Sequence, residues 1–323
     1  MNAFPSGRSD TTRPLWLAWL QLVRLPNLAT AVADPLAGFV IVAGFHDLSW
    51  LPPAGWLAVL ASVCLYAGGM VQNDVVDAEV DQHERPGRPL PSGQIAVGTA
   101  ALAANGLLAV GGLAACAAAV VAACPAPAFV GAVLTVAIWV YNRHAKGTLP
   151  GTVVMGSCRG LNWLLGMTAA GWPAGTLWLL PIGMGLYVTG ITIFARDEVE
   201  QGRRRLLLLG TAVMLGGLVL AGAVPGQALA NDTLAAGMWV AGGRLPAWLS
   251  LWSVLAVVIV TRCLQAAFDP SPRRMQAAIG NAIMAIITLD AVLVLAFCGE
   301  AWAIAIFMLL AWFVLGRRLA AVT

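Results

Sequence analysis

Residues 56–93 read WLAVLASVCLYAGGMVQNDVVDAEVDQHERPGRPLPSG, and they change abruptly from an apolar run to a charged loop. An α-helix rises about 1.5 Å per residue, so about 20 apolar residues cross a hydrocarbon core of roughly 30 Å. The stretch therefore predicts a membrane-spanning helix over about 56–78. The loop from residue 73 onward then sets five acids and two arginines where that helix ends.

The rest of the chain has the same apolar character. Of its 323 residues, 60% are hydrophobic and only 10% are charged, and the mean hydropathy is +0.83. A soluble globular domain has about a quarter of its residues charged, which excludes that class. The apolar runs are continuous rather than alternating, which excludes a strand-built barrel. The sequence predicts an all-α, polytopic transmembrane helical bundle.

The apolar runs divide into ten candidate spans, and the positive charges support the division. Sixteen of the 18 Lys and Arg lie in alternate loops or at the termini; the two exceptions are Arg244 and Arg159, which lies inside a span. By the positive-inside rule, both termini and the charged loops are expected in the cytoplasm. The spans are about 27–45, 56–78, 95–120, 126–142, 151–171, 175–195, 206–225, 247–265, 277–297 and 300–316.

We predict three parts: a cytoplasmic N-terminal segment with an interfacial helix over 1–26, a single bundle over 27–316, and a cytoplasmic tail over 317–323. The N-terminal charges precede no apolar signal region, so a cleavable signal peptide is not expected. The net charge of +3 reflects membrane topology, and no nucleic-acid partner is expected. The six cysteines lack CxxC spacing, which indicates apolar packing and no thiolate metal site. The oligomeric state stays open.

The acids of the loop have a helical spacing. Asn73, Asp77 and Asp81 are four residues apart, which places them on one helical face, and Asp74 lies beside that face. Such carboxylate and amide oxygens repel one another unless a cation lies among them. Mg²⁺ prefers oxygen ligands and is usually bound by one or two carboxylates together with substrate phosphates. The spacing therefore favours a metal and phosphate site, with ordinary solvated loop charges as the alternative.

Two arginines follow the acids in a proline-rich segment. Arg85 and Arg88 each directly precede a proline, which is unfavourable to a helix. The planar guanidinium group matches phosphate oxygens. Acids for a metal next to arginines for phosphate indicate a diphosphate site.

These residues resemble the first aspartate-rich motif of the UbiA superfamily of intramembrane prenyltransferases. The resemblance extends to Arg24, Pro26 and Asn27 in LVRLPNLATAVADPLAGF, and to Tyr141 and Lys146 in YNRHAKGTLPG. It implies a helical bundle around a central cavity, with an Mg²⁺-bound prenyl diphosphate as the donor. Ionisation of the donor would release diphosphate and give an allylic carbocation that alkylates a lipophilic, usually aromatic, acceptor. The expected location is the bacterial cytoplasmic membrane.

The resemblance assigns a role to each matching residue. The expected catalytic residues are Asp77, Asp81, Asp197 and Tyr141. The expected metal ligands are Asn73, Asp74, Asp77, Asp81, Asp197 and Glu200. The expected diphosphate ligands are Arg24, Asn27, Arg85, Arg88 and Lys146. Arg159 is added to them because of its position inside a span.

The second aspartate-rich motif departs from the family pattern. In FARDEVEQGRRR, residues 194–205, Asp197 and Glu200 keep a pair of acids, but Gln201 or Arg204 stands where another aspartate is expected. Glutamate supplies the same oxygens, so the chemistry can be conserved. The alternative is a specialised substrate, a terpene cyclase on the same scaffold, or a non-catalytic relative that binds or transports lipid.

Arg159 is the most unusual charge in the spans. A charge at that depth is costly unless it is paired or faces a wet cavity, so its side chain is expected to point into the bundle. With Asn162 on the same face, it would reach a diphosphate or an acceptor carbonyl. The alternative is a structural ion pair with Asp34 or Asp290, which also lie within spans.

Overall fold

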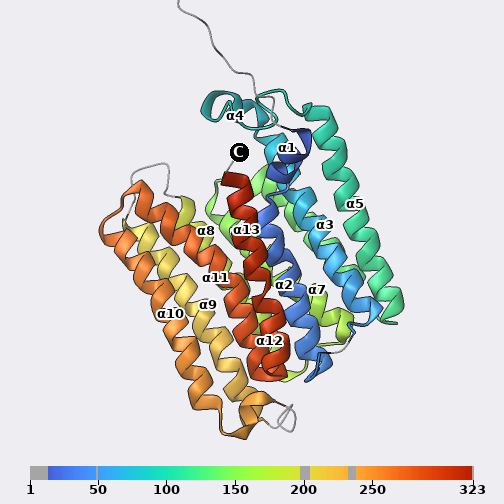
Figure 1. Ribbon diagram of the computed structural model, residues 1–323, viewed down its shortest axis with the longest axis vertical. Coiled ribbons are helices and arrows are strands. Elements are labelled where there is room, and N and C mark those ends of the chain that lie inside the picture. The colour runs from blue at the N-terminus through green and yellow to red at the C-terminus, as the bar shows by residue number, and fades with distance from the viewer. Residues whose placement is uncertain (1–13, 49, 197–203, 232–237, 322–323) are drawn as a thin grey trace, which may run out of the picture.

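The structure is a computed structural model that describes residues 14–48, 50–196, 204–231 and 238–321. Within these residues the regular elements are helices and there is no strand, which confirms the all-α prediction. The long helices run side by side as a bundle (Figure 1). The elements are α1 (Leu15–Leu22), α2 (Leu25–Ala43), α3 (Pro53–Val76), α4 (Ala78–Glu84), α5 (Val97–Val121), α6 (Ala126–Val140), η1 (Tyr141–Ala145), α7 (Leu149–Ala170), η2 (Gly175–Trp178), α8 (Leu179–Ala195), α9 (Arg204–Ala230), η4 (Trp239–Gly242), α10 (Leu245–Phe268), α11 (Pro272–Cys298), α12 (Glu300–Phe307) and α13 (Leu309–Ala321).

In the described part of the chain, nine helical segments are long and apolar enough to cross a membrane. The predicted span over 151–171 is not among them, although α7 has 22 residues. This helix carries Arg159 and Asn162, which lower its apolarity. It packs against α2, α3, α6 and α8, and both Arg159 and Asn162 contact Asp34 of α2. The last predicted span consists of α12 and α13, which meet at Met308.

Close contact between α2 and α7 depends on a glycine. A Cβ atom added to Gly166 would collide with the backbone carbonyl of Pro35, so a larger residue has no room there. Small residues at such crossings let membrane helices approach closely. This crossing positions Asp34, which precedes Pro35, beside the face of α7 that carries Arg159.

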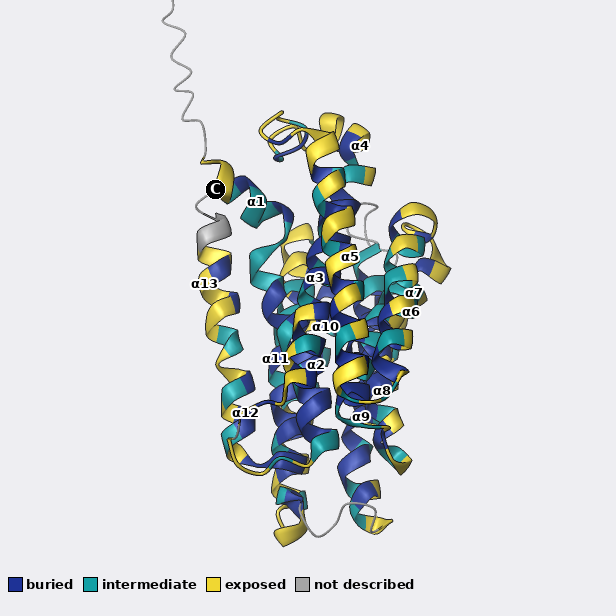
Figure 2. Cartoon of the chain, turned by 90° about the vertical axis from the view of Figure 1, so that its right-hand side faces the viewer, coloured by how far each residue is buried: buried dark blue, intermediate teal, exposed yellow. Residues whose placement is uncertain are grey.

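The buried residues gather along the axis of the bundle, and the exposed ones lie on its outer surface (Figure 2). The largest apolar cluster draws buried residues from α2, α7, α8, α9 and α11. A smaller cluster at one end joins α1, α3 and α5 to Leu90 and Ile95 of the loop after α4. The side chains of Leu90 and Ile95 hold this loop against the bundle. Both α1 and α4 lie at the end of the molecule where the chain terminates (Figure 1).

Helix α1 lies where the interfacial helix is predicted. Its placement at a membrane surface stays a prediction, as do the boundaries of the three predicted parts. Asp197 and Glu200 of the second acidic motif lie outside the described residues.

Candidate functional site

The acids of the first motif share one face, as their spacing predicts. Helix α3 ends at Val76 and α4 begins at Ala78, but Asp77 between them keeps a right-handed helical conformation. The Asp77 N–H donates to the Asn73 carbonyl at 3.0 Å, and the Asp81 N–H donates to the Asp77 carbonyl at 2.9 Å. These are the hydrogen bonds of a continuous helix. The helical register therefore persists across the junction.

The side chains of this motif are drawn together and largely removed from solvent. The Asn73 amide donates to Asp74 Oδ1 at 3.3 Å and to Asp77 Oδ2 at 3.2 Å. Asp74 is 8% exposed and Asp81 is 4% exposed. Carboxylates are seldom buried unless they are paired. The alternative of ordinary solvated loop charges does not hold for these two residues. We call Asn73, Asp74, Asp77 and Asp81 the acid cluster.

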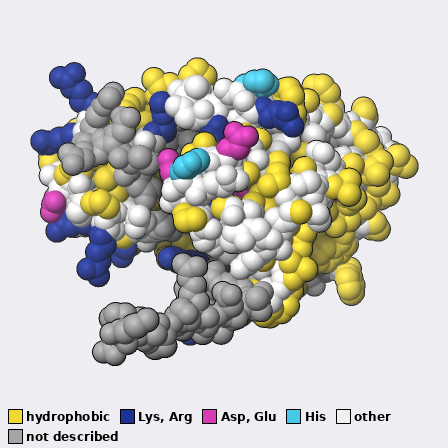
Figure 3. Space-filling model, turned by 90° about the horizontal axis from the view of Figure 1, so that it is seen from above, with side chains coloured by type: hydrophobic (Ala, Val, Ile, Leu, Met, Phe, Trp, Pro, Cys, Tyr) yellow, Lys and Arg dark blue, Asp and Glu magenta, His cyan; other side chains and the backbone are white. Residues whose placement is uncertain are grey.

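Three cations pair with the acid cluster: Arg88 from the loop after α4, and Arg24 and Lys146 from segments distant in sequence. Lys146 Nζ donates to Asn73 Oδ1 at 2.8 Å and forms an ion pair with Asp77. Arg88 Nη1 lies 2.6 Å from Asp81 Oδ2. Arg24 Nη2 lies 3.7 Å from Asp74 Oδ1, and Arg88 Nη1 lies 3.9 Å from the same oxygen. Charged side chains of both signs are visible together on this end of the molecule (Figure 3).

Local backbone features place two of these cations. Arg24 has φ of 51° and lies between α1 and α2 in a left-handed conformation that is uncommon for any residue but glycine. Lys146 follows η1, a five-residue π-helix over Tyr141–Ala145. π-Helical turns are rare and frequently occur at functional sites. Both deviations from regular helix bring a cation to the acid cluster.

The structure does not bring every predicted residue to the acid cluster. Arg85 is exposed and forms no ion pair with any residue in the described ranges. Asn27 lies at the start of α2, and its N–H donates to the Arg24 carbonyl at 2.8 Å. Arg159 lies deeper, in the membrane-spanning part of α7.

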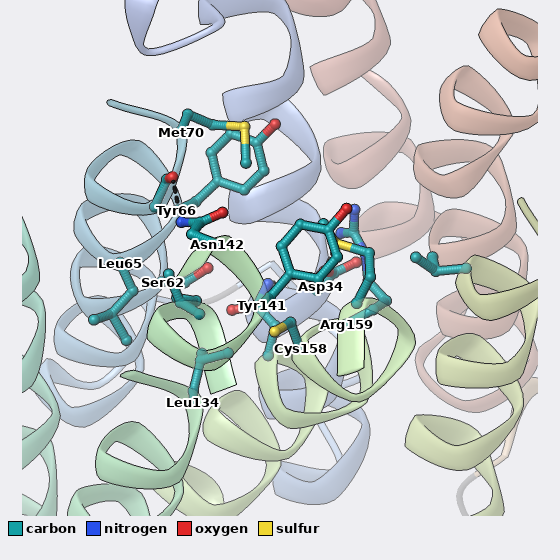
Figure 4. Close-up of a pocket in the computed structure, with 15 residues that line it drawn as sticks. Asp34, Ser62, Leu65, Tyr66, Met70, Leu134, Tyr141, Asn142, Cys158 and Arg159 are labelled. Atoms are coloured by element: carbon teal, nitrogen blue, oxygen red, sulfur yellow. Dashed lines mark hydrogen bonds and ion pairs between the residues drawn. The ribbon is translucent and has the colours of Figure 1, made fainter. Parts of the chain in front are cut away.

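An apolar cavity of about 100 Å³ lies between α2, α3, α6 and α7. Tyr141, Asn142 and Arg159 line it, as Figure 4 shows. The Asn142 amide donates to the Gly69 carbonyl at 2.9 Å and to Gln72 Oε1 at 3.0 Å, and these bonds join η1 to α3. The sequence-based prediction missed Asn142, although a polar residue at the end of an apolar span next to Tyr141 was a usable signal. A cavity is thus present in the bundle, and Asn142 connects it to the acid cluster through Gln72, which directly precedes Asn73.

Of the two predicted partners of Arg159, Asp34 and Asp290, the structure pairs it with Asp34. Arg159 forms an ion pair with Asp34, which also accepts a hydrogen bond from the Asn162 amide at 2.8 Å. Arg159 donates further to the Thr30 carbonyl at 3.3 Å and to Thr30 Oγ1 at 3.2 Å. Asp290 is fully buried, and neither of its carboxyl oxygens has a hydrogen-bond partner among the described residues. Arg159 therefore contacts Asp34 and Thr30 inside the bundle instead of the acid cluster.

The acid cluster has the ligand chemistry of a hard divalent cation, because its members offer carboxylate and amide oxygens. In the part of the chain that the structure describes, however, no three acidic, histidine or cysteine side chains lie close enough together to hold a metal ion. The oxygens of the acid cluster fit Mg²⁺ in their chemistry. In this structure the carboxylates form ion pairs with Lys146, Arg88 and Arg24.

Comparison with known proteins gives a consistent result. A family model described as the UbiA prenyltransferase family matches residues 31–277. A digeranylgeranylglyceryl phosphate synthase from Ignicoccus hospitalis is 29% identical over 275 residues, which cover 80% of this chain and 86% of that protein. A protein of the same name from Methanopyrus kandleri is 34% identical over 164 residues, but these cover only 50% of this chain and 56% of that relative.

Solved structures show the same fold. A structure from work on digeranylgeranylglyceryl phosphate synthase in membranes has a TM-score of 0.61 and 20% identity, and the match covers 91% of this chain and 99% of the other. A UbiA homologue from Archaeoglobus fulgidus bound to GPP and Mg²⁺ also has a TM-score of 0.61, with 17% identity over 90% of this chain and 99% of the other.

Proposed function

The chain belongs to the UbiA prenyltransferase family, and on this premise we propose that it transfers an isoprenoid group from a prenyl diphosphate to a lipophilic acceptor, with release of diphosphate. The observation that carries the proposal is the acid cluster with its three cations. One of these cations, Lys146, follows η1, whose Tyr141 and Asn142 line the apolar cavity. The names of the relatives and the GPP and Mg²⁺ of the Archaeoglobus fulgidus structure support the proposal.

We propose Mg²⁺ as the cofactor, held by oxygens of Asn73, Asp74, Asp77 and Asp81. The chemistry that Mg²⁺ supplies at such a site is positive charge against the leaving diphosphate. Asp197 and Glu200 are expected to complete the ligand set from the second motif.

The cations of the site are proposed to exchange partners when the donor binds. Lys146, Arg88 and Arg24 now neutralise carboxylates, and a diphosphate offers them the same kind of oxygen. Lysine and arginine form charge-assisted hydrogen bonds with phosphate as well as with carboxylate oxygens, so the donor offers these cations replacement partners. Arg85 and Asn27 are proposed to join them on the donor. Positive groups that are already in place then stabilise charge as it develops on the leaving group.

The cavity is proposed to shield the reacting carbon. Its lining is mostly apolar, which excludes water that would otherwise quench a carbocation. Tyr141 lines the cavity from η1 and directly precedes Asn142, which is bonded to α3. We assign Tyr141 the role of orienting the donor at the cavity mouth. An aromatic face there also favours a developing positive charge.

The protein is a multi-pass membrane protein, and we propose that the acid cluster faces the cytoplasm, because the charged loops gather at that end. That the membrane is a bacterial cytoplasmic membrane stays a prediction; the relatives named above are archaeal.

The test uses purified protein in liposomes made from a membrane lipid extract, with prenyl diphosphates of graded chain length. Released pyrophosphate and the mass of the lipid products are measured with Mg²⁺ and with EDTA. We expect Mg²⁺-dependent release that falls at least about 100-fold in Asp77→Asn and Asp81→Asn. Asp269→Asn, which removes an exposed carboxylate, is the matched control and should retain activity.

The outcomes separate the candidate functions. A product with the combined mass of prenyl group and acceptor supports a transferase, whereas a hydrocarbon derived from the donor alone indicates a cyclase. Absence of pyrophosphate release with every donor would indicate a lipid-binding or transport protein and would overturn the proposal.

A further inference from the structure

The cavity wall includes a set of polar side chains that the proposed ionisation of the donor does not use. It consists of Arg159, Asp34, Asn162 and Thr30, which we call the inner polar group. These residues come from α2 and α7, and three of the four, all but Thr30, line the cavity. Asp34 and Arg159 are seen at the cavity wall together with Tyr141 in Figure 4.

The guanidinium group of Arg159 has hydrogen-bonding capacity left over. A guanidinium carries five N–H donors. Within the described residues Arg159 makes three hydrogen bonds: to Asp34 Oδ2, to the Thr30 carbonyl and to Thr30 Oγ1. Two donors therefore have no protein partner in that part of the chain. The side chain is 12% exposed, and it lines the cavity. An isoprenoid tail beside it would leave both donors unsatisfied, which is unfavourable in an apolar site.

The charge of the inner polar group selects the kind of ligand. Arg159 and Asp34 are the only charged residues among the described ones that line the cavity, and they form an ion pair with no net charge. Asp290, which interacts electrostatically with both, adds no positive charge. A ligand anion would meet the Asp34 carboxylate without a spare cation to offset the repulsion. A neutral oxygen accepts from the guanidinium without this repulsion.

We propose that the inner polar group binds the uncharged hydroxyl or carbonyl oxygen of the lipophilic acceptor, and that Arg159 and Asp34 make this protein select neutral acceptors over anionic ones. The inference rests on the proposed prenyl transfer, since it assigns the acceptor end of the same cavity. The acid cluster then holds the diphosphate, and the inner polar group holds the acceptor.

The test measures binding of two matched probes, 4-propylphenol and 4-propylbenzoate, which differ in charge. Each is titrated into purified protein in detergent by calorimetry, with the heat of protein-free micelles subtracted. The parent protein should bind the phenol at least tenfold more tightly than the benzoate. Arg159→Lys keeps a cation beside Asp34 but removes the spare donors, so its affinity for the phenol should fall at least fivefold.

Asp34→Asn gives the sharper test, because it removes the compensating charge and keeps the shape of the side chain. Arg159 then presents an unbalanced positive charge, and the preference for the phenol should fall at least tenfold as the affinity for the benzoate rises. Asp269→Asn makes the same chemical change at an exposed site and should leave both affinities unchanged. A purely structural role for Asp34 predicts that the affinities for both probes fall together.

The proposal is overturned if the parent protein binds neither probe, if it binds the benzoate as tightly as the phenol, or if Asp34→Asn weakens both probes equally. The comparison of probes on the parent protein needs no variant, so a variant that fails to fold leaves the test intact. Neither measurement needs turnover. Failure of the proposed function shows as phenol binding without pyrophosphate release, and failure of this inference shows as release without a preference for the phenol.

Discussion

Lys146 connects the acid cluster to the segment that lines the cavity. Its ammonium group contacts Asn73 and Asp77 of the acid cluster, and it follows directly on the π-helical turn that begins with Tyr141 at the cavity. The proposed exchange of Lys146 from carboxylate to phosphate would therefore occur next to the residue proposed to orient the donor. The same ammonium group also offsets the repulsion between the acids when no donor is bound.

We expect Lys146→Met to weaken donor binding because a charge-assisted contact with the diphosphate is lost. The Michaelis constant for whichever prenyl diphosphate the parent protein turns over should rise about tenfold, which corresponds to about 1.4 kcal/mol. Arg143→Met is the matched control: Arg143 lies over the ring of Trp139 at 5.8 Å and makes no contact with the acid cluster in the described residues. Equal Michaelis constants for the parent and Lys146→Met would contradict the assigned role.

At the level of helices, the site depends on how α2 and α7 cross. The ion pair of Arg159 with Asp34 joins these two helices, and Gly166 lets their backbones meet. The apolar character that defines the other spans is reduced in α7 because this helix supplies the polar wall of the cavity. A helix of this kind is stable in the bundle since its neighbours cover it on several sides.

Gly166→Ala should destabilise the protein, because the added methyl group has to displace the backbone of α2. Overpacking of this kind costs about 1–3 kcal/mol, and the midpoint of thermal unfolding in detergent should fall. Gly112→Ala on α5 is the control, since a Cβ there meets nothing within 4 Å and alanine favours the helix. Its unfolding midpoint should stay equal or rise. If both variants unfold at the parent temperature, close packing at Gly166 is not needed.

At the scale of the whole molecule, the arrangement is asymmetric along the bundle axis. Helices α1 and α4 and the C-terminal end of α13 lie at one end of the molecule (Figure 1), and the acid cluster belongs to the junction of α3 and α4 at this end. The positive-inside rule predicts that this end faces the cytoplasm, and the proposed reaction would release its water-soluble diphosphate there.

This orientation predicts which loops a reagent can reach. In a variant without the six native cysteines, single cysteines at the exposed positions His83 and Arg273 should react with a membrane-impermeant thiol reagent only after the cells are opened. A cysteine at Trp172, at the other end of α7, should react in intact cells. Labelling of position 83 in intact cells would reverse the orientation and contradict a cytoplasmic site.

The sequence by itself determined the helical, membrane-spanning class and most of the span boundaries, because hydrophobicity and helical period are local properties of the chain. It also determined that Asn73, Asp77 and Asp81 share a face, since a spacing of four residues fixes this wherever the backbone stays helical. The family resemblance on these residues agreed with the match to the UbiA family model.

Only the tertiary structure decided which charges meet. Lys146 lies 69 residues from Asp77 and Arg159 lies 125 residues from Asp34, and no local pattern distinguishes these partners from Arg85 or Asp290. The choice depends on how helices pack and on the high cost of an unpaired charge in lipid, which favours whichever opposite charge the packing brings within reach. For this reason the sequence predicted the acids and cations of the first motif and offered two partners for Arg159, whereas only the packing of α2 against α7 selected Asp34 over Asp290.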